Sequence, residues 1–321
     1  MIATAARRQR MLTTAAPAAG VALVATGAAM WSSDSALRTQ LVAHWSPWTI
    51  VLYEHLLLAV LVAPRLWLSR RVIARLPSRQ WGAVVGVAWG GSALATLAFT
   101  FAFQGGNPDV VVLLQKTQPL WAVAIAALLL GERPRGRLLP VALVALAGTY
   151  LLSFGFLAPG AAFSGAEGRA ALLALVAAAL WGSATVLGRA ALADLDPDVL
   201  TGLRFTCAVP LLALIAATQH ATAPPVAAGG LDWLRIGLLA LLSGLLGMML
   251  YYRGLRRTPA SIATFAELAF PACALVVNYV VLGTTVNAVQ LAGFALLWLT
   301  IASLHWVPVT VARHERLAEP A

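Results

Sequence analysis

The stretch Ala28-Ala29-Met30-Trp31-Ser32-Ser33 returns later in the chain as Ala178-Ala179-Leu180-Trp181-Gly182-Ser183. The two tryptophans are 150 residues apart (181 − 31), and the same spacing separates Pro47 from Pro197. An internal match at one fixed spacing indicates a chain built from two related halves. The sequence therefore consists of two copies of one unit.

The composition indicates a membrane protein. Of 321 residues, 60% are hydrophobic and 11% are charged, and the mean hydropathy is +0.83. Soluble domains contain about 25% charged residues, so this chain cannot cover itself with a water-facing surface. Its apolar stretches approach the ~20 residues that a helix needs to cross a bilayer. They lack the polar and apolar alternation of membrane barrels, which predicts an all-α integral membrane protein.

Ten spans are predicted, five in each half. In the first half they are Pro17–Leu37, Pro47–Trp67, Trp81–Phe103, Asp109–Leu130 and Arg137–Phe156. In the second half they are Arg169–Leu192, Asp198–Gln219, Trp233–Leu255, Ser261–Leu282 and Ala288–Val309. The expected units are an N-terminal segment 1–16, a first repeat 17–156, a linker 157–168, a second repeat 169–309 and a tail 310–321.

The formal charge of +10 reflects membrane topology better than a nucleic-acid partner. With the N-terminus placed in the cytoplasm, seventeen arginines fall on the inner side and only Arg38, Arg169 and Arg235 on the outer side. This bias follows the positive-inside rule. It predicts a multi-pass protein of the inner (plasma) membrane with both termini in the cytoplasm.

Five spans per half is an odd number, so the second half enters the membrane from the opposite side. The two repeats are then inverted, an arrangement typical of carriers whose substrate site lies between the repeats. Such symmetry supports two states of similar energy, each open to one side. The sequence thus predicts alternating access for a small-molecule substrate, while the oligomeric state stays open and a monomer is plausible.

Several short motifs resemble one known family. They are Gly131-Glu132-Arg133-Pro134 at the end of the fourth span, Gly148, Trp181-Gly182 and Leu203-Arg204. This pattern is similar to that of EamA-type transporters of the drug/metabolite transporter superfamily. The resemblance implies two inverted five-helix repeats over essentially the whole chain. It also implies export of amino acids, related metabolites or toxic organic compounds, in some members by proton exchange.

The chain departs from that family pattern at three places. Ser32 replaces a glycine, Glu54 replaces an arginine, and Gly283-Thr284-Thr285 replaces the second Gly-Glu-Arg. These departures concern the substrate more than the fold.

The predicted spans hold charged residues that topology alone does not explain, and His55 lies beside one of them. They are Asp34, Glu54, Lys116, Arg204 and Glu267. A charge at the bilayer centre costs about 2.5–3.5 kcal/mol on insertion scales, so each one needs a partner or a task. From depth and repeat spacing we expect Glu54 to pair with Lys116 near the outer side, and Arg204 with Glu267 near the inner side.

Each pair has two interpretations. It could be a gate or a set of counter-charges around the substrate, or a static ion pair that fixes helix register. For Arg204 with Glu267 the static interpretation is favoured. For Lys116, the only lysine in the chain, a functional role is favoured.

Asp34 has no charged partner in the second half, where Ala184 stands at its position (184 − 34 = 150). An i,i+4 ion pair with Arg38 would explain it. The alternative makes Asp34 a proton carrier or the anchor of a substrate amine. Similarly, His55 is either a hydrogen-bonded structural residue or a proton relay.

Polar residues beside prolines mark the expected substrate site. Gln115, Lys116 and Gln118 run into Pro119, and Glu267 is followed by Pro271. A proline frees a helix carbonyl, so we expect a kink next to the polar cluster in both matched spans. Gln115, Gln118 and Trp31 are expected to contact the substrate.

The sequence therefore predicts a secondary active carrier of a small polar or amphipathic metabolite, with export of an amino acid or related compound favoured and proton coupling implied. The alternatives are an efflux carrier of drugs or toxic organic cations, an intramembrane enzyme and a passive channel. The chain shows no hydrolase, zinc-protease, Walker or nucleotide-binding motif, so we expect no enzymatic activity, cofactor or metal. The expected partners are the substrate, the lipid bilayer and H⁺, without nucleic acid.

Overall fold

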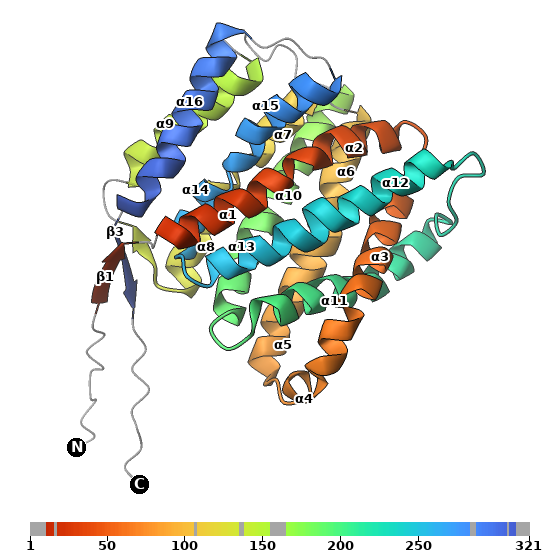
Figure 1. Cartoon of the computed structure of the whole chain (residues 1–321), viewed down its shortest axis with the longest axis horizontal. Helices are drawn as coiled ribbons and strands as arrows, with labels where there is room; N and C mark the ends of the chain where they lie inside the picture. The colour runs from red at the N-terminus through yellow and green to blue at the C-terminus, as the bar shows by residue number, and fades with distance from the viewer. Residues whose placement is uncertain are drawn as a thin grey trace.

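Helices occupy most of the described part of the chain. The computed structural model describes residues 11–15, 18–105, 108–134, 138–154, 165–282, 287–306 and 308–312. Within these ranges the helices stand side by side as a bundle, and the two halves of the chain interleave (Figure 1). The second-half helices α10 and α11, for example, pack against first-half helices.

The helices of the first half follow one another through five spans. They are α1 (Ala18–Met30), α2 (Ser32–Val42), α3 (Pro47–Leu68), α4 (Arg70–Ile73), α5 (Ser78–Val85), the π-helix η1 (Gly86–Leu94), α6 (Ala95–Gly105), α7 (Pro108–Gln115), α8 (Gln118–Leu129) and α9 (Leu138–Phe154).

The second half repeats this order with fewer interruptions. Its helices are α10 (Gly165–Ala191), α11 (Pro197–Thr218), α12 (Gly230–Leu238), the π-helix η2 (Leu239–Gly247), α13 (Met248–Leu255), α14 (Ala260–Ala266), α15 (Ala269–Leu282), α16 (Ala288–Ser303) and the short 3₁₀-helix η3 (Leu304–Trp306). In the described residues, five helices are long and apolar enough to cross a membrane: Pro47–Leu68, Ser78–Gln104, Gly168–Ala191, Pro197–Thr218 and Gly230–Leu255.

Irregular turns recur at matching places in the two halves. The π-helices η1 and η2 begin 153 residues apart (239 − 86). The fourth span is interrupted at Lys116-Thr117 and the ninth at Glu267-Leu268, 151 residues apart (267 − 116). Pro119 and Pro271 lie near the start of the helix that follows each interruption, as expected for residues that lack the N–H of a continuous helix. π-turns and broken helices are often found at functional sites.

The repeat is imperfect at its first span. The chain turns after Met30, so Trp31 lies between α1 and α2, whereas α10 runs without interruption through Trp181. The predicted single helix over Pro17–Leu37 is therefore two helices, and the second extends to Val42.

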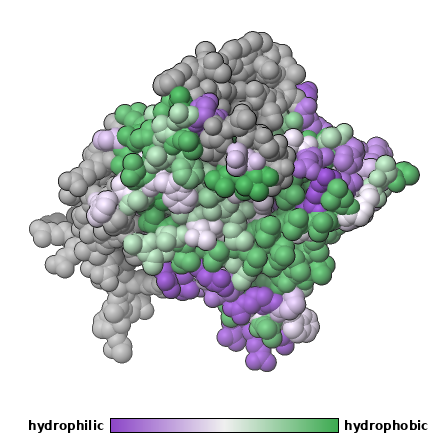
Figure 2. Space-filling view, turned by 45° about the horizontal axis from the view of Figure 1, so that its top comes forward, coloured by the Kyte–Doolittle hydropathy of each residue, from purple (hydrophilic) through white to green (hydrophobic). Residues whose placement is uncertain are grey.

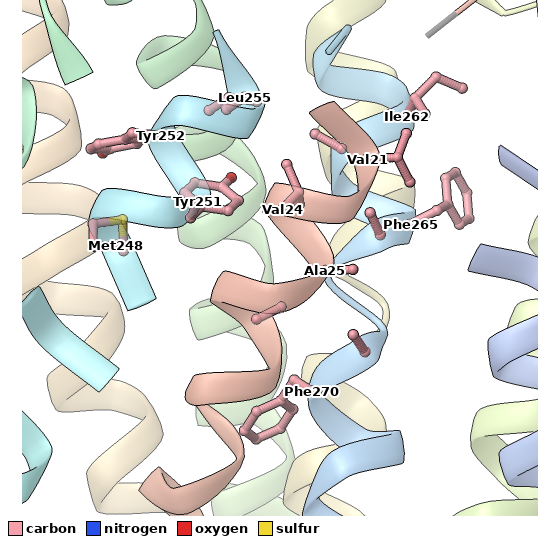
Figure 3. Packing of buried hydrophobic residues seen from close by; sticks show 14 of the residues in the cluster. Val21, Val24, Ala25, Met248, Tyr251, Tyr252, Leu255, Ile262, Phe265 and Phe270 are labelled. Carbon is pink, nitrogen blue, oxygen red and sulfur yellow. The ribbon is translucent and has the colours of Figure 1, made fainter. Parts of the chain in front are cut away.

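α1 packs between helices of the second repeat. Figure 3 shows its residues Val21, Val24 and Ala25 between α13 on one side and α14–α15 on the other. The backbones approach closely here, since a Cβ added to Gly27 would lie 2.6 Å from the carbonyl oxygen of Gly247. Small residues permit such close crossings between membrane helices. The core thus joins the two repeats.

The surface carries the apolar side chains that a bilayer would cover. Figure 2 shows a broad hydrophobic region across the visible face, with hydrophilic residues gathered at its edges. Large exposed side chains such as Leu128, Leu172 and Leu299 belong to different spans. Exposed apolar surface of this extent is typical of contact with lipid rather than water.

A small sheet departs from the all-helical expectation. β1 (Met11–Ala15), β3 (Pro308–Ala312) and β2 (Arg133–Pro134) pair antiparallel in the order β1-β3-β2, with Thr310 opposite both Thr13 and Arg133. The last predicted span, Ala288–Val309, accordingly ends earlier, as helix at Ser303. A proline within the first residues after a helix stops it, and Pro308 opens β3. We call the end of the bundle that carries this sheet the sheet side.

Candidate functional site

One cavity in the bundle collects most residues singled out from the sequence. It encloses about 130 Å³ and is lined by helices of both repeats. Nine of the eleven candidates line it: Trp31, Asp34, Glu54, His55, Gln115, Lys116, Gln118, Arg204 and Glu267. Pro119 and Pro271 are outside the lining. The expected two separate charged sites are therefore one site.

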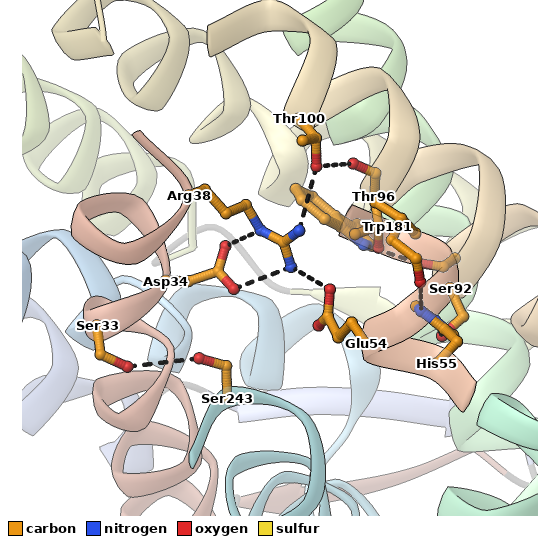
Figure 4. A network of polar contacts seen from close by, with 12 residues as sticks. Ser33, Asp34, Arg38, Glu54, His55, Ser92, Thr96, Thr100, Trp181 and Ser243 are labelled. Carbon is orange, nitrogen blue, oxygen red and sulfur yellow. Dashed lines mark hydrogen bonds and ion pairs between the residues drawn. The ribbon is translucent and has the colours of Figure 1, made fainter. Parts of the chain in front are cut away.

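At one wall of the cavity, two carboxylates share one guanidinium (Figure 4). Arg38 Nε donates to Asp34 Oδ2 at 2.6 Å, and Arg38 Nη2 donates to Glu54 Oε2 at 2.7 Å and to Asp34 Oδ1 at 3.1 Å. Its Nη1 donates to Thr100 Oγ1. Arg38 and Glu54 are buried. Buried charges need partners of this kind.

This cluster corrects two predictions. Glu54 is paired with Arg38 and not with Lys116. Arg38 was assigned to an outer loop, but α2 continues to Val42 and carries it into the interior. The i,i+4 pair of Asp34 with Arg38 is present as expected.

His55 belongs to a hydrogen-bonded chain rather than to an ion pair. Its Nδ1 is 2.9 Å from the Val51 carbonyl oxygen, so Nδ1 carries the proton and donates it. Nε2 then accepts from Ser92 Oγ at 3.1 Å, and the same hydroxyl oxygen accepts from Arg204 Nε at 3.2 Å. One ring nitrogen donates and the other accepts, which is the pattern of a neutral imidazole. The geometry supports the structural interpretation of His55.

Arg204 is held by neutral groups. Besides Ser92, it donates to the Tyr252 hydroxyl at 3.0 Å and to the Gly91 carbonyl oxygen at 3.1 Å. Both Gly91 and Ser92 belong to the π-helix η1, whose wider turn exposes backbone acceptors. Among the described residues no acid forms a salt bridge with Arg204, so the expected pair with Glu267 was wrong.

Glu267, at the end of α14, accepts hydrogen bonds on both oxygens. Gln118 Nε2 donates to Oε2 at 2.5 Å, while Tyr251 and Thr185 donate to Oε1 at 2.8 and 3.2 Å. Gln118 in turn accepts from Gln115 at 2.7 Å. The two helix interruptions thus face each other across the repeat boundary.

Lys116 lies at the interruption between α7 and α8. Its Nζ is 3.7 Å from the centroid of the Phe270 ring, a cation–π contact. Glu267 attracts it electrostatically, although the two do not form a salt bridge. Lys116 is buried.

Sequence reasoning missed several residues of the site. Arg38, Ser92, Trp181, Thr185 and Tyr251 all line the cavity. Trp181 could have been found, because it is the repeat partner of Trp31. Tyr251 packs on Trp31 with ring centroids 5.1 Å apart, a contact between segments distant in sequence that no local pattern indicates.

A further buried carboxylate lies outside the cavity. Glu132 accepts from the backbone N–H groups of Ala260 and Ser261, both at 2.9 Å, and from Ser261 Oγ at 2.6 Å. Its side chain therefore caps the first turn of α14, the position where a negative charge is favourable. The preceding Gly131 has φ 64°, which a residue with a side chain rarely adopts and which turns the chain toward α14. We call this contact the Glu132 cap.

Comparison with known proteins decides the family. The profile of the EamA-like transporter family matches residues 18–154 and 168–305. This chain belongs to the EamA-like transporter family. The two matched segments correspond to the two halves of the bundle, and the predicted fold, an all-α membrane protein of ten helices in two inverted repeats, is confirmed.

Two other similarities agree with an EamA-like fold. The chain is 31% identical over 290 residues to the riboflavin transporter ImpX of Fusobacterium nucleatum subsp. nucleatum (strain ATCC 23726 / VPI 4351), covering 89% of this chain and 97% of that protein. It also superposes on a chain of a solved crystal structure with a TM-score of 0.72 at 21% identity, covering 88% of this chain and 95% of that one. The structural match supports the fold alone.

Proposed function

We propose that this EamA-like protein is a secondary carrier that moves a small polar or amphipathic metabolite by alternating access, and that the cavity is its substrate site. The observation that carries this is the convergence of buried charged, amide and aromatic side chains from both repeats on one cavity. In a carrier built from two repeats, the substrate site lies at the boundary between the repeats. We further propose an inner-membrane location with cytoplasmic termini and no enzymatic activity.

An amino acid or related compound is the first candidate substrate, moved outward. The cavity of about 130 Å³ is comparable to the ~150 Å³ protein cavity that holds benzene. Its charged groups suit a polar head, and Trp31, Tyr251 and Phe270 suit an apolar side chain.

Riboflavin is the second candidate, because a relative that covers most of this chain transports it. The flat ring could stack on the aromatic wall, and the amides of Gln115 and Gln118 could bond its polar edge. This ligand is larger than the cavity in the present conformation, so it would need an opened state.

Proton coupling would use the shared guanidinium. Asp34 and Glu54 together carry two negative charges, and both pair with the one positive charge of Arg38. If one of these carboxylates binds a proton, the other still pairs with the guanidinium. Protonation weakens one ion pair and would favour one access state over the other.

The test is counterflow in proteoliposomes with labelled amino acids and riboflavin, between pH 5 and 8. We expect one class to be exchanged, and Lys116→Ala to reduce exchange at least about tenfold without loss of folded protein. Arg65→Gln serves as the control, because Arg65 forms an exposed salt bridge with Asp196 away from the cavity. Equal exchange by wild type and Lys116→Ala would contradict the cavity as the substrate site.

A further inference from the structure

We propose that the substrate carries an anionic group, a carboxylate or a phosphate, and that Lys116 and Arg204 bind this group in the cavity. The proposal rests on the proposed function, because it takes the cavity as the substrate site. It narrows the substrate class and assigns the two cations the role of anion anchor.

The acids of the cavity are already engaged within the protein. Both oxygens of Asp34 accept from Arg38, and both oxygens of Glu267 accept from neighbouring side chains. Glu54 accepts from Arg38 through Oε2. Each acid of the cavity therefore already has at least one donor from the protein.

The two cations are not engaged in the same way. A guanidinium has five N–H donors and an ammonium has three. Arg204 uses three of its five, all toward neutral oxygens, which leaves two. For the Lys116 ammonium, the structure shows a contact with the Phe270 ring and no hydrogen bond to the described residues. Both side chains are more than nine-tenths buried and line the cavity.

Neutral acceptors satisfy hydrogen bonds, but they do not balance a charge. A buried cation without a counter-ion is costly in a protein interior and more so inside a membrane. Glu267 attracts Lys116 from beyond salt-bridge distance, and the structure gives Arg204 no acidic partner within the described residues. An anionic group on the ligand would supply the missing negative charge.

The repeat explains why the protein lacks this counter-ion. Arg204 stands at the position of Glu54 (204 − 54 = 150), and Glu54 has Arg38 beside it. At the positions that match Asp34 and Arg38, the second repeat has Ala184 and Gly188. The first repeat thus places a cation beside Glu54, whereas the second has no charged residue at the matching positions beside Arg204.

Matched pairs of probes test the proposal on purified wild-type protein. L-phenylalanine and L-phenylalaninamide differ in the carboxylate, and riboflavin 5′-phosphate differs from riboflavin in the phosphate. We expect the anionic member of at least one pair to bind about tenfold or more tightly, measured by calorimetry and by ligand-induced thermal shift. The pair that shows the preference distinguishes carboxylate from phosphate.

Variants then locate the preference. Arg204→Gln and Lys116→Gln should each abolish it, Arg204→Lys should retain part of it, and the control Arg65→Gln should leave it unchanged. Equal affinity within both pairs, no binding of any of the four probes, or a preference that survives Arg204→Gln with Lys116→Gln would overturn the anion anchor. Transport of a neutral solute that depends on Glu54 would still support the carrier, so the two proposals fail separately.

Discussion

Arg38 stabilises two buried acids at once. It donates to Asp34 and to Glu54 from one guanidinium that is itself buried. A planar fork of donors suits this double contact, which a lysine ammonium could not reproduce. The stability of this cluster therefore depends more on Arg38 than on either acid.

Arg38→Gln should destabilise the protein more than the loss of either acid, because it leaves two carboxylates without a counter-ion. Breaking a buried pair in this way typically costs about 3–5 kcal/mol. Thermal unfolding in detergent would measure the change. Adding Glu54→Gln and Asp34→Asn to Arg38→Gln should restore much of the stability; a triple variant as unstable as the single one would show that the charges are not the cause.

The site residues could be predicted from the sequence better than their partners. Charged or amide residues in apolar spans are few, so Lys116 and Glu267 stand out without a structure. Their pairing depends on how helices face one another, and the depth estimate for Glu54 carried no such information. Arg38 was missed because the predicted span ended at Leu37, five residues before the end of α2 at Val42 (42 − 37).

At the scale of elements, α8 and α14 are fastened to each other at both ends. The Glu132 cap holds the start of α14 at the sheet side, and the Gln118–Glu267 hydrogen bond joins the pair at the cavity. Each helix belongs to a different repeat. We expect these contacts to break if the proposed carrier opens its cavity between α8 and α14.

Glu132→Gln should loosen this closure, because it removes the charge at the α14 N-terminus and one of the acceptor oxygens. We expect faster labelling of a Thr264→Cys reporter by a water-soluble thiol reagent, in a background where Cys207 and Cys273 are replaced. Glu132→Asp, which keeps the charge, is the control. Unchanged labelling in Glu132→Gln would contradict a closing role for the cap.

Element boundaries show where sequence patterns stop being informative. The apolar length of the spans predicts how many there are, and Pro119 and Pro271 indicated the two interruptions. No proline indicates the π-turns of η1 and η2 or the turn at Trp31, because these turns arise from packing between helices. The small sheet was missed because its strands pair across nearly the whole length of the chain.

For the whole molecule, the two repeats are held together where α1 crosses α13. Gly27 and Gly254 let the backbones approach, since an added Cβ would lie 2.6 Å and 2.7 Å from a carbonyl oxygen of the facing helix. A carbonyl oxygen in a helix backbone cannot move aside as a side chain can. This crossing therefore leaves no room for a methyl group.

Gly27→Ala should lower the melting temperature, whereas Gly82→Ala should leave it unchanged or raise it. A Cβ at Gly82 meets nothing within 4 Å, and alanine is favoured over glycine in a helix by about 0.5–1 kcal/mol. Thermal unfolding of the two variants under the same conditions compares them directly. Equal behaviour would argue against a tight crossing between the repeats.

The β1-β3-β2 sheet joins three distant parts of the chain by backbone pairing. Its middle strand, near the C-terminal end, pairs with a strand near the N-terminal end and with the two residues directly after Glu132. The strand near the C-terminal end thus pairs directly with the residues that follow the Glu132 cap, and the strand near the N-terminal end is joined to them through it. We therefore expect affinity tags, fluorescent fusions and truncations at either end to affect the neighbourhood of the Glu132 cap, so that transport by tagged and untagged protein should differ if the sheet supports the cap.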